Sequence, residues 1–459
     1  MTTIKLDPGA ALLLDALHGA GHAAYAVGGC VRDSLLGLDP HDWDLCTSAR
    51  PEQVMALFGE EKCIPTGLQH GTVTVKQGGR LYETTTFRTE GAYSDGRHPD
   101  AVCFVPDVRE DLARRDFTIN AMAYSAEEGL IDPFGGRDDL AAHLVRAVGE
   151  PERRFEEDAL RILRLYRFAA RFGFAIDPAT GAAARALGPH LDCVSAERIQ
   201  EELLKLLAAP RPGRYLEPAV LAVILPELEP EKQPERFTEL CRTIDRIEPT
   251  AENVPTRLAV LLCPLGEAGA RKALRKLKCS NALTDEVTAL EREAGGGAGS
   301  FLLPRSRDRW AGSSSEDRPL GWDPAAAGSR AGDGMARTVS EEEAPGTPGS
   351  EMQLTAKRLL GRYELPTIQR LTALCSARHP EQTGTFAALR AEAERLTAEN
   401  ACCRVSQLAV NGRDLMAAGV RPGPGLRQVL NALLEAVITG QTPNEKDALL
   451  AAAAQFSAS

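Results

Sequence analysis

Two aspartates separated by one residue, Asp42 and Asp44, are the side chains in this sequence best suited to hold a metal ion. On a strand, residues two apart point to the same face, so both carboxylates would lie together while Trp43 and Leu45 face the core. Carboxylates this close repel each other unless a cation lies between them, and hard oxygen ligands suit Mg²⁺. Such an ion bridges nucleotide phosphates and activates an attacking hydroxyl. A solvated strand edge is the alternative for an isolated pair.

A glycine pair, Gly28-Gly29, precedes these aspartates and follows the strand-like residues 24–27. At a strand-to-helix junction, glycines let the backbone approach a ligand and direct N–H groups at phosphate. Arg32, in the first turn of the expected helix, adds a fork of donors suited to a triphosphate. The glycine pair alone is weak evidence, and the segment matches neither a P-loop nor a dinucleotide-binding fingerprint.

Two further positions carry charges that could serve the same chemistry. Glu83, on the expected strand 81–87, is a candidate third catalytic carboxylate, or a glutamate that merely faces solvent. Arg114, Arg115 and Asp116 are expected at a helix start, where the arginines could hold phosphates. The same three residues could equally form a helix cap with a surface salt bridge.

A polar stripe runs along the expected helix 157–168. Asp158, Arg161, Arg164 and Arg167 recur every three residues, with leucines and Phe168 between them. One interpretation is a set of salt bridges three residues apart on a solvated face, which contribute only a few tenths of a kcal/mol. The other is a functional surface that presents a carboxylate and guanidinium groups to a ligand.

The elements that must position these residues fall into two classes. Up to about residue 146, short β-branched or aromatic segments alternate with short helical ones. From Phe155 onward the period is helical, and strand signals nearly vanish. Residues 295–350 are rich in Gly, Ser, Pro and Ala without periodicity, which predicts a disordered insertion. We hypothesise that it replaces a helical stretch through a local reading-frame error.

The ordered motifs resemble a known family. The pattern Gly-Gly-x-Val-Arg-Asp followed by Asp-x-Asp resembles the polymerase-beta nucleotidyltransferase superfamily. Later segments are similar to the class II tRNA nucleotidyltransferases, the bacterial CCA-adding enzymes. These segments are PTGLQHGTVTV (65–75), DLARRDFTINAMAY (111–124), DPFGGRDDL (132–140), EDALRILRLYRF (157–168), SAERIQEELLKLL (195–207) and the C-terminal stretch 411–445.

This resemblance implies an α+β head with a mixed sheet and helices, followed by an all-α neck, body and tail. The implied domains are a catalytic head (1–146), a neck that reads the base (147–210), a body (211–294), the insertion (295–350) and a tRNA-binding body and tail (351–459). The catalytic residues would be Asp42, Asp44 and Glu83, of which Asp42 and Asp44 hold the metal. The nucleotide-binding residues would be Gly28, Gly29, Arg32, Asp33, Arg114, Arg115, Asp116, Asn120, Asp158, Arg161, Arg164 and Arg167.

The implied reaction is Mg²⁺-dependent addition of CCA to the tRNA 3′ end from CTP and ATP, with the enzyme contacting the acceptor and T arm. Asp158 and Arg161 would form the template, because cytosine and adenine each place an amine donor beside a ring-nitrogen acceptor. A poly(A) polymerase, a CC-adding or A-adding specialist, and a catalytically inactive RNA-binding module are the alternatives. The missing basic GRRF-type stretch argues against the polymerase, and the intact aspartates argue against the inactive module.

Composition narrows the protein class. The net charge of −11 does not exclude nucleic acid, because arginines cluster locally along the chain. No apolar run approaches the ~20 residues that span a bilayer, so no membrane partner is expected. Eleven scattered cysteines and no export signal predict a cytoplasmic protein with reduced thiols. None of the eight histidines has a zinc-site spacing, and Cys263-Pro264 stands where some relatives carry a His-Asp phosphohydrolase motif.

Overall fold

The computed structural model describes residues 3–91, 102–295 and 348–456. The chain divides into two compact units, Met1–Thr288 and Ala289–Ser459. Each unit is described by itself. Nearly all of the predicted insertion, residues 296–347, lies outside the described residues. Among the described helices, none combines the length and apolar character that a membrane crossing requires.

The first unit begins with a seven-stranded mixed sheet of order β3-β4-β5-β2-β1-β8-β9. The β2–β5 pair is parallel and the other pairs are antiparallel. The strands are β1 (Ala24–Val27), β2 (Leu45–Thr47), β3 (Cys63–Gly67), β4 (Thr72–Gln77), β5 (Arg80–Thr86), β8 (Ala123–Ser125) and β9 (Gly129–Ile131). A separate antiparallel pair joins β6 (Arg88–Glu90) to β7 (Val102–Phe104). The predicted mixed sheet is therefore confirmed.

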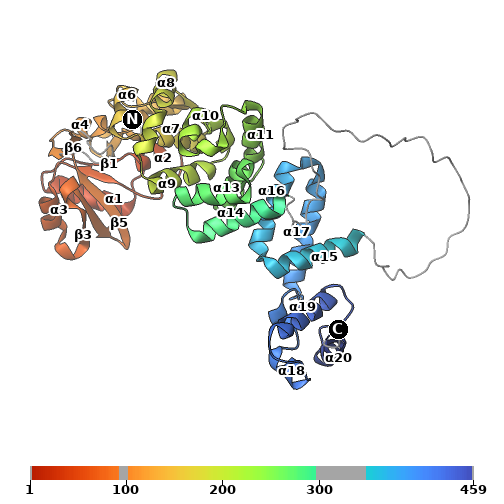
Figure 1. The fold of residues 1–459 in the computed structure, drawn as a ribbon. Helices are drawn as coiled ribbons and strands as arrows, with labels where there is room; N and C mark the ends of the chain where they lie inside the picture. The colour runs from red at the N-terminus through yellow and green to blue at the C-terminus, as the bar shows by residue number, and fades with distance from the viewer. Residues whose placement is uncertain (1–2, 92–101, 296–347, 457–459) are drawn as a thin grey trace, which may run out of the picture. The chain divides into compact units, whose positions relative to one another are not determined.

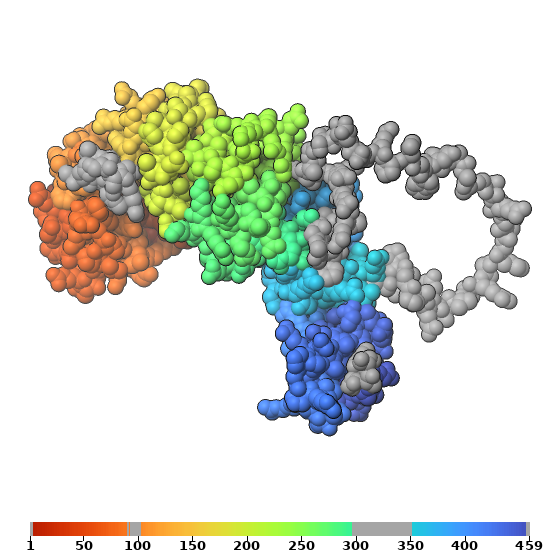
Figure 2. All heavy atoms as spheres, in the orientation of Figure 1, coloured from red at the N-terminus to blue at the C-terminus, as the bar shows by residue number. Residues whose placement is uncertain are grey.

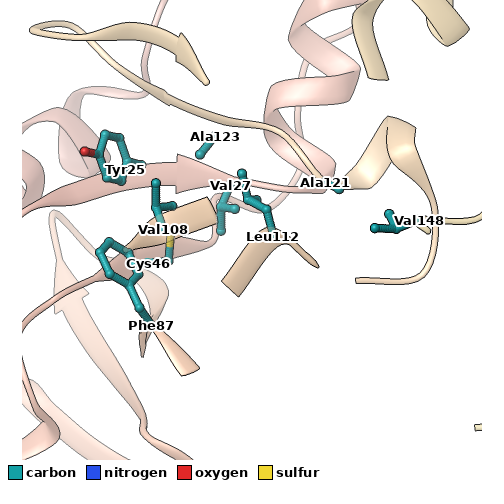
Figure 3. Packing of buried hydrophobic residues seen from close by; sticks show 9 residues of the cluster. All are labelled: Tyr25, Val27, Cys46, Phe87, Val108, Leu112, Ala121, Ala123 and Val148. Atoms are coloured by element: carbon teal, nitrogen blue, oxygen red, sulfur yellow. The ribbon is translucent and has the colours of Figure 1, made fainter. Parts of the chain in front are cut away.

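Buried apolar side chains hold this sheet against short helices. These helices are α1 (Pro8–Gly19), α2 (Gly29–Leu35), α3 (Pro51–Phe58), α4 (Val108–Ala113) and α5 (Gly136–Ala141). All four residues of β1 are buried, so this central strand is covered on both faces. Tyr25 and Val27 from β1 pack with Phe87, Val108 and Leu112 in one cluster (Figure 3). Removing such surface from water is the main force that orders the sheet.

Helices follow the sheet through the rest of the first unit and into the second (Figure 1). They are α6 (Pro151–Glu157), α7 (Leu160–Phe172), α8 (Pro178–Ala186), α9 (Ala196–Leu207), α10 (Pro218–Ile224), α11 (Pro234–Asp245), α12 (Val254–Leu262), α13 (Gly266–Lys276) and α14 (Asn281–Ala294). One small departure from the predicted all-α region is the two-residue strand β11 (Ala175–Ile176), which pairs in parallel with β10 (Leu144–Val145). In the space-filling view, residues 3–91 and 102–288 lie together in one body, coloured red through green (Figure 2).

The second unit is helical in its described part. Its helices are α15 (Pro348–Arg362), α16 (Leu365–Arg378), α17 (Thr383–Ala398), α18 (Gly412–Ala417), α19 (Pro424–Ile438) and α20 (Lys446–Phe456). Leu415, Val429, Leu433 and Leu449 bury the apolar faces of α18, α19 and α20 against one another. Helical periodicity in the sequence correctly predicted this class of structure.

Candidate active site

A cleft of about 680 Å³ lies in the first unit and brings together most of the predicted site residues. Eight arginine and lysine side chains and four aspartates line it. The lining residues are Gly28, Gly29, Arg32, Asp42, Asp44, Arg114, Arg115, Asp116, Asn120, Asp158, Leu160, Arg161, Arg164, Arg167, Phe168, Arg198 and Lys205. The excess of cations in a concave site favours a polyanionic ligand such as a triphosphate.

The two aspartates predicted to hold a metal both line this cleft. They were expected on a strand, but β2 begins only at Leu45, so Asp42 and Asp44 lie in the extended segment just before it. The predicted alternation still holds, because Trp43 and Leu45 are buried while both aspartates are exposed. An extended backbone alternates its side chains whether or not it is paired in a sheet.

The electrostatics of Asp44 fit a cation site. Protein atoms around the Asp44 carboxylate displace water from it, and this desolvation, followed by the charge of the nearby Glu83, raises the pKa of Asp44 to about 6. Arg115 acts to lower this pKa, and Asp42 acts to raise it. Glu83 is close because Leu45 on β2 pairs with Thr84 on β5, which places the preceding residues side by side. A divalent cation would relieve this repulsion between carboxylates. Glu83 lies next to the cleft lining and is not part of it.

The fit to a metal rests on two carboxylates rather than three. Across residues 3–91, 102–295 and 348–456, no set of three His, Cys, Asp or Glu side chains is gathered tightly enough to form a metal site. Mg²⁺ commonly takes one or two protein carboxylates and completes its shell with water and substrate phosphates. Asp42 and Asp44 therefore suit Mg²⁺ bound together with a nucleotide.

The first glycine of the pair, Gly28, acts differently from the prediction. Gly28 has a φ of 77°, which favours glycine, and its N–H donates to the carbonyl of Met122 at 3.0 Å. This amide is therefore used within the sheet and is not available to a phosphate, so that part of the prediction is wrong. A Cβ at Gly28 would lie 2.9 Å from a terminal nitrogen of Arg115. The missing side chain thus makes room for Arg115 beside the cleft.

Arg32 is held by neighbouring residues at the wall of the cleft. Its Nε donates to Asp33 at 2.7 Å, and one terminal nitrogen donates to Asn120. The guanidinium lies 5.2 Å from the ring centre of Phe168 and 4.9 Å from that of Phe172. These contacts tie α2 to α7 and fix the direction of the remaining donors.

The segment with Arg114 and Arg115 follows a helix rather than starting one. Helix α4 ends at Ala113, and Arg114 is its C-cap, which corrects the predicted helix start. Both arginines donate to the fully buried carboxylate of Asp111, at 3.0 and 3.3 Å. Burial alone would raise the pKa of Asp111, but the two guanidinium groups lower it. The salt bridge proposed as the alternative is present, although its acidic partner is buried and not on the surface.

Asp116 links this segment to α7. Its carboxylate accepts from the Nε of Arg164 at 2.9 Å and from the side-chain amide of Asn120 at 3.1 Å. Burial acts to raise the pKa of Asp116, but Arg164 and Asn120 hold it below its usual range. Asp116 is therefore an anion that positions other side chains and cannot itself hold a phosphate.

Asp158 and Arg161 both line the cleft but do not lie on one helix. Asp158 is the first residue of a two-residue break between α6 and α7, with an extended φ of −150°, and α7 begins at Leu160. The prediction that Asp158 starts the helical stripe is therefore wrong. Arg161 donates to Glu157 at 2.7 Å and to the carbonyl of Arg114 at 3.1 Å. Asp158 instead accepts from Arg198, at 2.7 and 3.2 Å.

The polar stripe on α7 is a buried network rather than a solvated face. Arg164 binds Asp116, and Arg167 donates to Glu202 on α9 at 2.5 Å. The guanidinium of Arg167 also lies 4.0 Å from the ring centre of Phe168. The partners of Arg164 and Arg167 come from other segments, whereas Arg161 pairs locally with Glu157, four residues earlier. The interpretation as salt bridges three residues apart is therefore wrong for these three arginines. Periodicity cannot reveal such partners because they are distant in sequence.

No residue of α9 was predicted to belong to the site, although the segment 195–207 resembles a motif of the family. Arg198 and Lys205 both line the cleft. They are seven residues apart, which places them on one face of a helix, and this spacing is the signal that could have identified them. Buried Arg257 donates to the carbonyls of Leu207 and Ala209, at 2.6 and 2.5 Å, and so fixes the C-terminal end of α9.

Comparison with known proteins agrees with this cleft. Residues 24–146 match the poly A polymerase head domain, 173–232 a probable RNA- and SrmB-binding site of polymerase A, and 366–453 a putative tRNA nucleotidyltransferase domain 2. The CCA-adding enzyme of Lactobacillus helveticus is 34% identical over 95% of this chain and 94% of its own length. The chain belongs to the family of CCA-adding enzymes. This family is metal-dependent.

Other relatives in this family support the same conclusion. The CCA-adding enzyme of Geobacillus stearothermophilus is 34% identical over 96% of this chain and 94% of its own. A crystal structure of the Bacillus stearothermophilus CCA-adding enzyme, in complex with CTP, aligns with a TM-score of 0.72 and 31% identity over 98% of both chains. The Thermotoga maritima CCA-adding enzyme complexed with tRNA shares the fold, with a TM-score of 0.61 at 20% identity.

Proposed function

We propose that this protein adds the CCA sequence to the 3′ end of tRNA, using CTP and ATP, through the cleft described above. The observation that supports this most strongly is that one cleft contains a carboxylate pair, a set of arginines, and the Asp158–Arg161 pair of base-reading groups. Relatives in the family were solved with CTP, with ATP and with tRNA. A poly(A) polymerase and an inactive RNA-binding module explain this combination less well.

Each end of the cleft has its own task in this proposal. Asp42 and Asp44 hold Mg²⁺, with Glu83 adding negative charge beside them. When bound, the ion lowers the pKa of the tRNA 3′ hydroxyl and offsets charge on the phosphates. Arg32, Arg114, Arg115, Arg164 and Arg167 form the cationic wall that binds and orients the triphosphate. Asp33, Asp116 and Asn120 position those arginines, and Gly28 and Gly29 leave room for them.

Base selection would occur at Asp158 and Arg161. A carboxylate accepts the exocyclic amine of cytosine or adenine, and a guanidinium donates to the adjacent ring nitrogen. Uracil and guanine present the reverse pattern, so acceptor would face acceptor and donor would face donor. Arg198 holds the Asp158 carboxylate in place, and the backbone carbonyls around Arg161 direct its guanidinium.

The domain boundaries and location form part of the same proposal. The head (1–146) carries the carboxylates, the neck (147–210) reads the base, and the body (211–294) with the body and tail (351–459) binds the tRNA acceptor and T arm. None of the eleven cysteines, all of which are among the described residues, forms a disulfide, which suits a reducing compartment such as the cytoplasm.

Incorporation on a tRNA that lacks its CCA end tests this function. The protein is supplied with CTP alone, ATP alone, or both, and the products are sequenced. We expect two cytidines with CTP alone and a complete CCA with both. A long A tail would identify a poly(A) polymerase, a product that stops at CC or gains only A would identify a specialist, and no incorporation would contradict the proposal.

A further inference from the structure

A second pocket of about 280 Å³ lies in the first unit and shares no residue with the cleft. We call it the α8 pocket. Its residues come from α7, β11, α8, the turn 212–215 and the start of α10: Tyr166, Ile176, Asp177, Pro178, Gly181, Arg185, Arg214, Tyr215, Leu216, Glu217 and Pro218. Tyr166 lies two residues after Arg164, about 200° around α7. The pocket and the cleft therefore lie on opposite sides of the same helix.

Within this pocket, the hydroxyl of Tyr166 lacks a hydrogen-bond partner among the described residues. The side chain is 4% exposed, and this hydroxyl is buried. A buried hydroxyl left unpaired is costly, and such groups are nearly always bonded in folded proteins. Burial, and then Glu217, raise the pKa of Tyr166, so the phenol is neutral and can donate a hydrogen bond.

The rest of the lining suits a planar ring joined to an anion. Tyr215 donates its hydroxyl to the carbonyl of Phe174 at 3.1 Å, which fixes the orientation of its ring. Arg185 and Arg214 are exposed at the pocket, where Arg185 also forms an ion pair with Glu217 at 4.0 Å. Aromatic faces stack on nucleobases and arginines bind phosphate, a combination typical of single-stranded nucleotide binding.

We propose that the α8 pocket binds one nucleoside monophosphate unit, with its phosphate at Arg185 and Arg214 and its base edge at the Tyr166 hydroxyl. The unit is either an unpaired nucleotide of the RNA substrate or a free nucleotide. Residues 173–232, which match the probable RNA-binding model, contain every lining residue except Tyr166. The RNA source rests on the proposed function, whereas the free-nucleotide source does not.

Hydrogen exchange of the full chain tests the site directly. CMP or AMP should slow exchange in peptides covering residues 175–186 and 212–224 of the wild type. Tyr166→Phe and the double variant Arg185→Ala/Arg214→Ala should lose this protection, while the charge-matched control Arg211→Ala/Arg242→Ala, outside the pocket, should keep it. Protection in the wild type with unchanged KM for tRNA in every variant identifies a free nucleotide as the occupant.

Steady-state kinetics test the RNA source. With tRNA lacking CCA, the KM for tRNA should rise roughly threefold in Tyr166→Phe and roughly tenfold in the double arginine variant, with kcat and the KM for CTP unchanged. No protection by CMP or AMP together with an unchanged KM for tRNA would overturn the proposal. The proposal would also be overturned if the control variant raised the KM for tRNA by the same factor. The same holds if the double arginine variant raised that KM while Tyr166→Phe did not. Failure of the proposed function appears separately, as absence of incorporation by the wild type.

Discussion

The carboxylate of Asp158 is held by Arg198 of α9, at 2.7 and 3.2 Å, while Arg161 donates to Glu157 and to backbone carbonyls. The two groups proposed to read the base are therefore positioned independently, each by its own partners. This independent positioning suits a rigid template. If Asp158 and Arg161 formed a salt bridge with each other, each incoming nucleotide would have to break it. The paired geometry of a carboxylate with two guanidinium nitrogens also fixes the plane of Asp158.

Arg198→Lys should weaken base selection. Lysine replaces a planar fork by a point charge, so the Asp158 carboxylate loses its fixed orientation. We expect the KM for CTP and ATP to rise roughly tenfold and misincorporation of UTP to increase. Single-nucleotide incorporation assays measure both. Arg242→Lys, at an exposed pair with Glu239, is the control. Unchanged selectivity in Arg198→Lys would show that Asp158 needs no such support.

Removing either proposed metal ligand should abolish most activity without unfolding the protein. Asp42→Ala or Asp44→Ala should lower kcat by roughly 10²–10³-fold or more, because charge stabilisation in the transition state is lost. Chelation of the metal in the wild type should have the same effect, and added Mg²⁺ should reverse it. Incorporation from CTP is the measurement, with circular dichroism to verify folding. Activity that survives in the double variant would place the metal elsewhere.

Glu83→Gln should lower the pKa of Asp44. Desolvation and then the negative charge of Glu83 are the two largest causes that together raise the pKa of Asp44 to about 6. Without that charge, the metal-free protein should ionise Asp44 at a lower pH. Carbon-13 NMR of the labelled carboxyl groups follows this titration. Glu52→Gln, at an exposed glutamate of α3, should leave it unchanged, and an equal pKa in both variants would contradict the predicted proximity of Glu83.

Tyr166→Phe should stabilise the protein when no nucleotide is present. The substitution removes a buried hydroxyl that has no partner among the described residues, and such a group costs about 1 kcal/mol or more. The thermal midpoint should therefore rise slightly. Tyr25→Phe is the contrasting variant, because the hydroxyl of Tyr25 donates to Glu128 at 2.6 Å, and its loss should destabilise. A lower thermal midpoint for Tyr166→Phe would show that the Tyr166 hydroxyl already has a hydrogen-bond partner in the folded protein.

Glu291→Gln should change how stability depends on pH. Glu291 is 5% exposed, and burial raises its pKa to about 7, although Arg378 opposes this. A carboxyl whose pKa is higher in the folded state stabilises below its unfolded pKa, near 4.5, and loses that contribution as the pH rises through about 7. At pH 8, Glu291→Gln should therefore be more stable than the wild type by about 2–3 kcal/mol.

Thermal unfolding between pH 5 and 8.5 tests this prediction. The difference between Glu291→Gln and the wild type should be smallest at pH 5 and grow until the pH passes about 7, above which it should level off. Glu351→Gln, at an exposed position of α15, should follow the wild type throughout. A constant difference across this range would show that Glu291 does not titrate in it.

The fold class, the family and the types of residue in the cleft could all be predicted from the amino-acid sequence. Alternation at residues 42–45 and helical periodicity after residue 155 are local properties, and local spacing encodes them directly. The chemistry of Asp42, Asp44, Arg161 and Arg164 likewise follows from side-chain type and motif.

Which of these groups contact one another could not be predicted, because it depends on how distant segments pack. Asp158 lies in a break before α7, and its carboxylate accepts hydrogen bonds from Arg198. Arg164 pairs with Asp116, which is 48 residues away in the sequence. The amide of Gly28 is bonded within the head, and the Tyr166 hydroxyl has no hydrogen-bond partner in the described part of the chain. Such partners depend on how separate elements pack, and one sequence contains no local signal for contacts between residues far apart in the chain.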